Sequence, residues 1–173
     1  MTPARPGLPI WILRLSNHGH KLMTNGQQRM TDREVTVYAW IVARLLRTGF
    51  RKLSSGDPAP VLNAFAPGAR LIFPGEHSWA LDSTDHTEIA DWFHRFAAYS
   101  PQITVTDIVV KGPPWNTRVC SRGSDRIKLP DGRTYENEWC QFARLSWGKL
   151  RLDRIYVDTQ RVAALDRWLA EAR

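Results

Sequence analysis

The sequence predicts an α+β domain in which helices pack on one face of an antiparallel sheet. Three observations carry this prediction. Residues 35–53 repeat apolar side chains at helical spacing, residues 103–157 form strand-like runs between tight turns, and a last helical stripe follows Asp158. At 173 residues, with 43% hydrophobic residues and eight tryptophans, the chain is long and apolar enough for one packed core.

The strongest helical pattern begins after Thr31 and Asp32, which are good N-cap residues. Its apolar stripe consists of Val35, Tyr38, Ala39, Val42, Leu45, Leu46 and Leu53. Residues 1–30 are rich in Pro and Gly and show no sustained period, so we expect a disordered tail, or a misassigned one if the natural start is Met30. The predicted domain is therefore 31–173.

Two shorter helices and a strand are expected next. Asp57 as N-cap and Pro58 at the first helical position predict a second helix that stops at Pro67-Gly68. Residues 70–75 then read as a strand that ends at its own Pro-Gly pair. Asp85 opens a third helix like a capping box, and the apolar stripe of that helix consists of Ile89, Trp92, Phe93, Phe96 and Ala97.

After Pro101 the chain becomes rich in β-branched and aromatic residues. Four strands separated by the turns GPP, LPDG and WG predict an antiparallel meander, with strand ranges 103–111, 115–122, 133–147 and 149–157. Asp158 then caps a closing helix, whose apolar stripe consists of Val162, Leu165 and Leu169.

The charge pattern argues against nucleic acid as a partner. The formal charge is +7, but 4 of the 24 basic residues lie in 1–30, where there is no acid, and the other 20 are interspersed with 17 acidic residues. The apolar run LPIWIL is too short to span a membrane, so no membrane partner is expected. Cys120 and Cys140 form neither a disulfide framework nor a zinc motif, and no metal or cofactor is expected. We expect a cytoplasmic protein.

The stretch RTYENEWCQF at 133–142 is polar on both faces of its predicted strand. One face carries Tyr135, Asn137, Trp139 and Gln141, and the other carries Glu136, Glu138, Cys140 and Phe142. A strand with one face in a core should alternate apolar and polar side chains. One of the two faces is therefore expected to serve a function.

Three stretches resemble the SnoaL-like, nuclear-transport-factor-2-like superfamily, and in particular its ketosteroid isomerase-related branch. They are SSGDPAPVLNAFAPGARLIFPG, LPDGRTYENEW and GKLRLDRIYVDT. The resemblance implies a cone-shaped, cystatin-like α+β fold, in which a curved sheet packed by N-terminal helices encloses a cavity. It also implies that Tyr135, Asn137, Trp139 and Gln141 line this cavity with Asp153 facing them, while Glu136, Glu138 and Arg144 point outward.

The chemistries of the resembled superfamily fit this sequence incompletely. The base and tyrosine positions of ketosteroid isomerase match Phe73 and Gly49, which carry no such groups. Of the Asp-Arg-Asp set of limonene-epoxide hydrolase, the arginine matches Arg122, but the aspartate positions match Ser124 and Ile155. Asp125 and Asp153 lie close to these positions and form a possible displaced pair.

A polyketide cyclase needs mainly one well-placed carboxylate base. Asp153 is our candidate base, with Gln141 and Arg122 or Arg118 holding it ionised; the alternative is a structural ion pair. His77 borders the cavity mouth in the resembled fold and is a third candidate catalytic residue, the alternative being an exposed loop histidine. Asn137 and Gln141 either orient a ligand or satisfy backbone groups.

We therefore expect a protein that binds a small apolar or amphipathic molecule. As an enzyme it would be a cofactor-independent isomerase, cyclase or hydrolase. Alternatively it is a non-catalytic ligand-binding or dimeric interaction domain, with the cavity filled by Trp139 and its apolar neighbours. A homodimer is expected in either case, because folds of this superfamily commonly pair through the outer sheet face, where Glu138, Phe142 and Arg144 suit a mixed interface.

Overall fold

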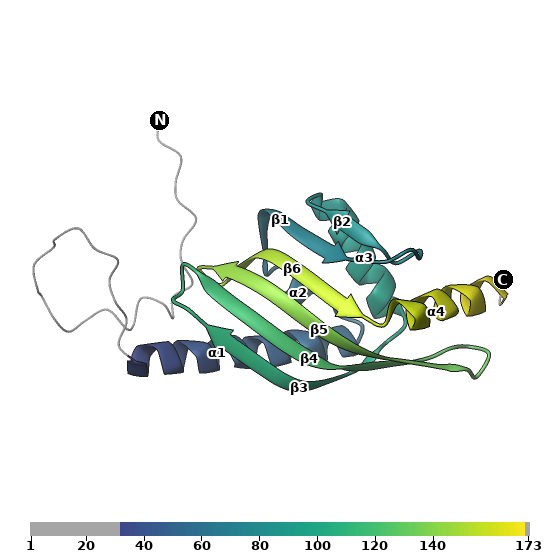
Figure 1. The fold of residues 1–173 in the computed structure, drawn as a ribbon, viewed down its shortest axis with the longest axis horizontal. Coiled ribbons are helices and arrows are strands. Elements are labelled where there is room, and N and C mark those ends of the chain that lie inside the picture. Colours follow the sequence, from purple (N-terminus) through teal and green to yellow (C-terminus); the bar gives the residue numbers. More distant parts are fainter. Residues whose placement is uncertain (1–31, 172–173) are drawn as a thin grey trace, which may run out of the picture.

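The computed structural model describes residues 32–171, with side chains described from Thr36 onward. The chain forms helices and strands in the following order: α1 (Asp32–Ser54), α2 (Ala59–Leu62), β1 (Phe65–Phe73), β2 (Leu81–Ser83), α3 (His86–Ala98), β3 (Gln102–Lys111), β4 (Thr117–Lys128), β5 (Thr134–Ser146), β6 (Lys149–Val157) and α4 (Thr159–Glu171) (Figure 1). The expected tail at 1–30 lies outside the described residues.

The six strands form one sheet in the order β2-β1-β6-β5-β4-β3. Strands β3 to β6 are the predicted antiparallel meander, and β1 adds to β6 in parallel. Irregularities in the register, such as the one between Val105 and Asp107 on β3, favour local bending of a sheet. The α1 helix runs along the sheet next to β3, and α4 lies beside the far end of the β4–β5 hairpin (Figure 1).

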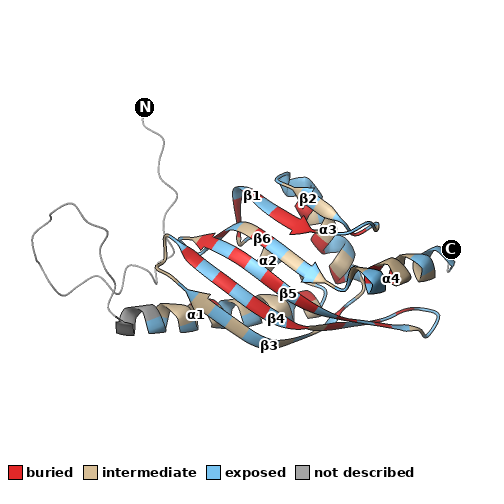
Figure 2. Cartoon of the chain, in the orientation of Figure 1, coloured by how far each residue is buried: buried red, intermediate tan, exposed pale blue. Residues whose placement is uncertain are grey.

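Buried and exposed residues alternate along β4 and β5 (Figure 2). One face of these strands therefore packs on the helices, and the other faces outward. The core has two parts. One part includes Leu71, Ile89 and Val119, and the other includes Ile127, Tyr135 and Val162 at the end of the sheet near α4.

The α1 helix confirms the predicted helix, although its buried stripe is narrower than expected. Val42 and Leu53 are buried, but Leu45 is 57% exposed, so its assignment to the core was wrong. Phe50, which the predicted stripe omits, lines the cavity described below. The side chain of Val35 lies outside the described part of the chain.

The predicted second helix is much shorter than expected. The α2 helix ends at Leu62, and β1 already begins at Phe65, so Pro67-Gly68 lies inside a strand and does not stop a helix. Gly68 has a φ of +69°, and the register with β6 shifts between Phe65 and Arg70. The Pro-Gly pair therefore forms a strand irregularity, which a glycine with positive φ allows. The three-residue strand β2 was not predicted.

Two of the three predicted aspartate caps are present, those of Asp85 and Asp158. The α2 helix has Pro58 at its N-cap position instead of Asp57, whose carboxylate accepts only from the backbone N–H of Ala59 at 3.1 Å. Asp85 accepts hydrogen bonds from the backbone N–H groups of Thr87 (2.6 Å) and Glu88 (3.4 Å) at the start of α3. Asp158 accepts from Gln160 (3.0 Å) and Arg161 (3.4 Å) at the start of α4. Each side chain satisfies backbone donors that the first turn of a helix leaves unpaired. Among the described helices, none is long and apolar enough to cross a membrane.

Candidate functional site

The β5 strand presents to the helices the face that we predicted. Tyr135, Asn137, Trp139 and Gln141 are buried, whereas Glu136 and Glu138 are exposed. Directly paired residues of antiparallel strands lie on the same face of the sheet, so the odd-numbered residues of β4 face the helices as well. Asp125 on β4 pairs with Asn137 and is buried as well.

A cavity of about 90 Å³ lies between this face and the helices. Its wall is almost entirely aliphatic and aromatic, with side chains from α1, α3, α4 and strands β1, β3, β4, β5 and β6. The charged or hydrogen-bonding side chains on the wall are Asp125, Tyr135, Gln141 and the indoles of Trp79, Trp92 and Trp139. A mostly apolar pocket with a few polar groups is the usual form of a small-molecule site.

Asp125 is the carboxyl group on this wall. It is only 7% exposed, and no other side chain in the described part of the chain bonds to it. Burial raises the pKa of Asp125 from 3.8 to about 7, because an apolar environment disfavours the charged form, and a hydrogen bond to its own backbone offsets only part of this effect. Asp125 can therefore accept or release a proton near neutral pH.

Tyr135 is positioned beside this carboxyl group by Asn137. The Nδ2 of Asn137 donates to Tyr135 Oη (2.8 Å) and to the Asp158 carbonyl (3.0 Å), and its Oδ1 accepts from the Asp158 backbone N–H (3.2 Å). The side-chain amide of Asn137 therefore links β5 to the backbone at the start of α4. Burial, together with the negative charge of Asp125, raises the pKa of Tyr135. The phenol stays protonated and can donate its own hydrogen.

Asp153 is on the inner side of the sheet, as predicted, but it is sealed from the cavity. It is 1% exposed and lies diagonally to Gln141, whose direct partner is Ile155. Gln141 Nε2 lies 2.7 Å from each carboxylate oxygen of Asp153, and Gln141 Oε1 accepts from Ser121 Oγ at 3.0 Å. Gln141 lines the cavity and Asp153 does not. Burial raises the pKa of Asp153 to about 7, and the bond from Gln141 opposes this shift.

The expectation that Arg122 or Arg118 holds Asp153 ionised is wrong. Both arginines are exposed on the outer face, and Arg122 pairs directly with Cys140 across β4 and β5. The Nε of Arg122 lies 3.0 Å from a carboxylate oxygen of Asp107. Strand residues alternate between the two faces of a sheet. Arg118 and Arg122, at even positions of β4, therefore lie on the face opposite to that of Asp125.

His77 lies in the loop between β1 and β2, half-buried against the Phe73 ring at a centroid distance of 5.6 Å. Neither ring nitrogen has a hydrogen-bond partner in the described part of the chain. The cavity wall does not include His77, although Phe73 belongs to it. The structure therefore places His77 behind the wall, beside an aromatic ring.

Trp139 shapes the cavity without filling it. Its ring lies against Phe50 at a centroid distance of 5.2 Å. Across the sheet its direct partner is Gly123, where an added Cβ would come within 2.7 Å of the indole and 2.1 Å of the Thr104 carbonyl oxygen. Only glycine leaves room for the indole at this point.

The indole nitrogen of Trp79 is an unused donor at the site. Trp79 is 4% exposed and lines the cavity, and its Nε1 has no hydrogen-bond partner in the described residues. The Arg95 guanidinium covers the indole at 3.6 Å from the ring centroid, which fixes its position. A buried donor without a partner costs free energy that a ligand acceptor would recover.

The sequence indicates Asp125 only as half of a displaced carboxylate pair, because the predicted strand ends at residue 122. The β4 strand continues to Lys128. The alternation of Val119, Ser121 and Ile127 inward with Arg118 and Arg122 outward contains the signal that assigns Asp125 to the cavity side. No group of three or more His, Cys, Asp or Glu side chains able to hold a metal occurs among residues 36–171.

Comparisons with solved structures identify the fold. An NTF2-like protein of unknown function from Burkholderia pseudomallei is 18% identical, with 72% of this chain and 96% of that chain covered and a TM-score of 0.61. TerC, crystallised with polyporic acid, is 14% identical over 73% of this chain and 98% of its own, with a TM-score of 0.61. IdmH, a putative polyketide cyclase from Streptomyces antibioticus, is 20% identical over 71% of this chain and 96% of its own, with a TM-score of 0.56.

No model of a protein family matches the sequence, and no curated protein matches it. The chain has the NTF2-like fold, an α+β cone with a curved, unclosed sheet and helices packed on it. This confirms the predicted fold class, and solved structures with the same fold include NTF2-like proteins, as the resemblance implied. Assignment to the ketosteroid isomerase-related branch stays a prediction.

Proposed function

We propose that this protein binds a small, mostly apolar carbonyl compound in the cavity and that Asp125 moves a proton on it without a cofactor. The observation that carries the proposal is a buried carboxyl group without a side-chain partner on the wall of an apolar cavity. A group whose pKa lies near 7 is suited to act as a general base and then as the acid at neutral pH. Asp125 replaces Asp153 as the proposed base, because Gln141 separates Asp153 from the cavity.

The proposed reaction step uses residues that line the cavity. Ionised Asp125 accepts a proton from the carbon next to a carbonyl group, and the C–H electron pair forms the C=C bond of an enolate. The negative charge moves to the carbonyl oxygen, which accepts a hydrogen bond from Tyr135 Oη or Trp79 Nε1. Protonated Asp125 then returns the proton to carbon. Alternatively, the enolate carbon attacks a second carbonyl group, a C–C bond closes the ring as that C=O π bond breaks, and Asp125 protonates the alkoxide that results. Preorganised donors of this kind stabilise a developing oxyanion most effectively where water is excluded.

The similar structures support this class of ligand. IdmH is described as a putative polyketide cyclase, and TerC was crystallised with polyporic acid, so structures at this similarity include a proposed cyclase and a protein crystallised with a small organic molecule. The small cavity volume favours compounds smaller than the drug-sized ligands that fill about 300–1,000 Å³. Hydrolysis by a carboxylate pair is less well supported, because Asp125 reaches the cavity and Asp153 does not.

The test is exchange of carbon-bound hydrogen in D₂O, followed by NMR with a panel of small cyclic ketones and enones. Wild type should accelerate deuterium incorporation next to the carbonyl group, and Asp125→Asn should lose at least about 100-fold of this activity. Asp153→Asn serves as a matched buried control and should retain exchange.

Two outcomes would count against the proposal. If the ketones raise the melting temperature equally in wild type and Asp125→Asn and neither exchanges hydrogen, the cavity serves non-catalytic binding, which is the competing function. If no compound of the panel binds or exchanges, ligand binding in this cavity is itself contradicted.

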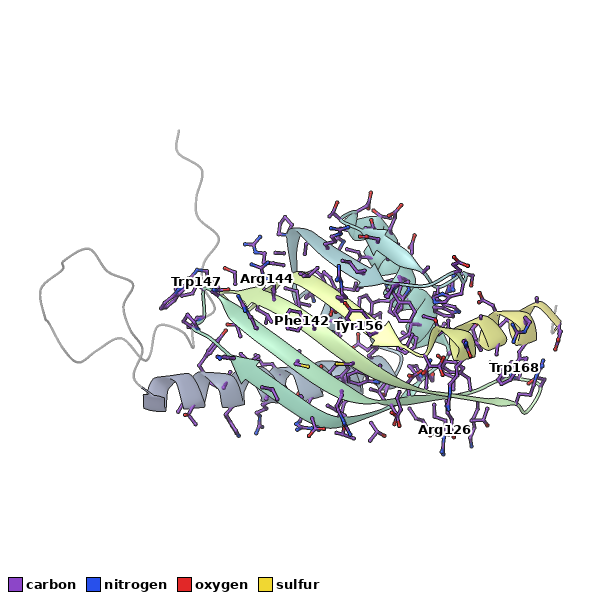
Figure 3. All side chains as sticks on the ribbon, viewed as in Figure 1. Arg126, Phe142, Arg144, Trp147, Tyr156 and Trp168 are labelled. Carbon is purple, nitrogen blue, oxygen red and sulfur yellow. The ribbon has the colours of Figure 1, made fainter. Side chains whose placement is uncertain are left out.

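The outer sheet face is proposed to pair with a second copy of the chain. Phe142 and Tyr156 are exposed there beside Arg144, and Figure 3 shows all three on the same side of the sheet. Exposed aromatic residues among charged ones are typical of mixed interfaces. Sedimentation of wild type and Phe142→Glu tests this: a dimer that becomes a monomer is expected, and a wild-type monomer would contradict the proposal.

A further inference from the structure

A groove beside α1 combines a row of unpaired cations with an aromatic floor. It has a volume of about 640 Å³ and lies between α1 and β3. Arg44, Arg47 and Arg51 line it and are exposed, and Trp40 stands one turn before Arg44. These four residues follow one another at spacings of four, three and four, which places them on one face of the helix.

The three arginines have no acidic partner in the described part of the chain. Arg44 lies over the Trp40 ring, with its guanidinium carbon 5.4 Å from the centroid, and Arg51 donates to Thr48 Oγ1 at 3.1 Å. Some exposed arginines of the sheet, namely Arg70, Arg122 and Arg126, each form an ion pair with a carboxylate. Three cations along roughly 10 Å of helix therefore create a positive field over the groove that no neighbouring acid neutralises.

The groove adjoins the cavity. Phe50 and Ile103 line both spaces, so the groove and the apolar interior meet at these two side chains. The Phe50 ring contacts the Trp139 ring on the cavity side, and Phe50 precedes Arg51 in α1. Phe50 therefore lies where the two spaces meet.

We propose that the groove is the entrance to the cavity and selects anionic amphipathic ligands, that is, molecules with a carboxylate, sulfate or phosphate group at one end of an apolar body. The apolar body passes Phe50 into the cavity, and the anionic end stays on Arg47 and Arg51. Guanidinium groups suit such oxyanions because they donate two parallel hydrogen bonds. This inference rests on the proposed function, since it names the ligand class of the same cavity.

Calorimetric titration with decanoate, decanol and decyltrimethylammonium tests the inference. Each probe is used below the concentration at which it forms micelles or aggregates. These probes share a tail and differ in charge. Wild type should bind decanoate roughly five- to tenfold more tightly than decanol, and the cation most weakly. Arg47→Gln/Arg51→Gln should lose this preference with decanol binding unchanged. The matched control is Arg151→Gln, at an exposed arginine of β6 outside the groove, which should behave as wild type.

Each contrary result identifies what fails. Equal binding of decanoate and decanol, unaltered in the double variant, would overturn the inference while cavity binding stands. If decanoate and decanol bind at the same time without competing, the groove and the cavity are separate sites. This result would overturn the inference that one ligand occupies both. Weaker binding of both probes by the double variant would assign the arginines a structural role and contradict selection. Absence of binding by every probe would overturn the inference, and the carbonyl panel would then decide the proposed function by itself.

Discussion

The side-chain amide of Gln141 lies 2.7 Å from both carboxylate oxygens of Asp153 and separates this buried acid from the cavity. Replacing Gln141 by Leu leaves the carboxyl group buried without its donor. We expect a loss of about 2–3 kcal/mol of unfolding free energy at pH 8, measured by urea denaturation. The loss should be smaller at pH 5, because Asp153, with a pKa of about 7 in the folded protein, is then neutral. Gln160→Leu, at an exposed glutamine of α4, is the control and should change stability by less than about 0.5 kcal/mol.

Asp125 should make stability depend on pH. Its pKa is about 7 in the folded protein and near 3.8 when unfolded. Between these values the folded protein binds the additional proton, so the free energy of unfolding falls as pH rises from about 4 to 7 and is then constant with respect to this group. Asp125→Asn removes this loss. Because no side chain pairs with Asp125, the variant should be more stable than wild type by roughly 2–4 kcal/mol at pH 8 and similar to it at pH 4.

Denaturation curves from pH 4 to 8 measure this difference. The control is Asp91→Asn, at an exposed aspartate of α3, which should leave the pH profile unchanged. A destabilised Asp125→Asn variant at pH 8 would show that the carboxylate has a favourable partner, and it would remove the basis for Asp125 as a base.

Two glycines give opposite predictions for the same substitution. At Gly123 a Cβ would approach the Thr104 carbonyl oxygen to 2.1 Å and Trp139 to 2.7 Å, so Gly123→Ala should cost about 2–4 kcal/mol. At Gly49, in α1, the nearest atom to a Cβ is Val61 Cγ2 at 3.5 Å, an ordinary contact. Gly49→Ala should therefore stabilise the protein by about 0.5–1 kcal/mol through helix propensity. Thermal unfolding compares the two, and similar melting temperatures for both variants would contradict the proposed packing of Trp139 on Gly123.

The α4 helix should depend on Asp158 as its cap. Asp158→Ala removes the acceptor for the backbone N–H groups of Gln160 and Arg161, and we expect a loss of about 1 kcal/mol in chemical denaturation. Asp158→Asn preserves the acceptor oxygen and should stay within about 0.5 kcal/mol of wild type. Equal losses in the two variants would indicate that the charge of Asp158, which lies 3.5 Å from Arg161, matters more than the cap.

The two faces of β5 were predictable because a strand alternates its side chains with a period of two, and the resemblance to the NTF2-like superfamily indicated which face is the inner one. Once Trp139 and Gln141 were assigned inward, Tyr135 and Asn137 followed, and the outward position of Glu138 followed as well. The caps at Asp85 and Asp158 were predictable for a similar reason, since each depends only on the first turn of its own helix. Phe50 was missed because the predicted stripe of α1 omitted its position.

The base proposed for the site could not be chosen from sequence alone. Asp125 and Asp153 are both buried inward-facing acids, and they differ only in that Gln141 covers one of them. Arg122 was a natural partner by its place in the chain, but the register of β4 on β5 turns it outward. The end of β4 was also misplaced, because the segment after Arg122 contains Gly123 and Ser124, residue types common in turns.

Local patterns in the sequence thus determined the helices, the meander, the caps and the faces of the strands, because each depends on residues a few positions apart. Tertiary structure alone decided that Pro67-Gly68 lies within a strand, that Asp153 is sealed by Gln141 and that Asp125 faces a cavity. It also placed the arginine row of α1 next to that cavity. These relationships depend on the strand register and on how side chains from distant elements fill shared space, and no period in the sequence encodes either.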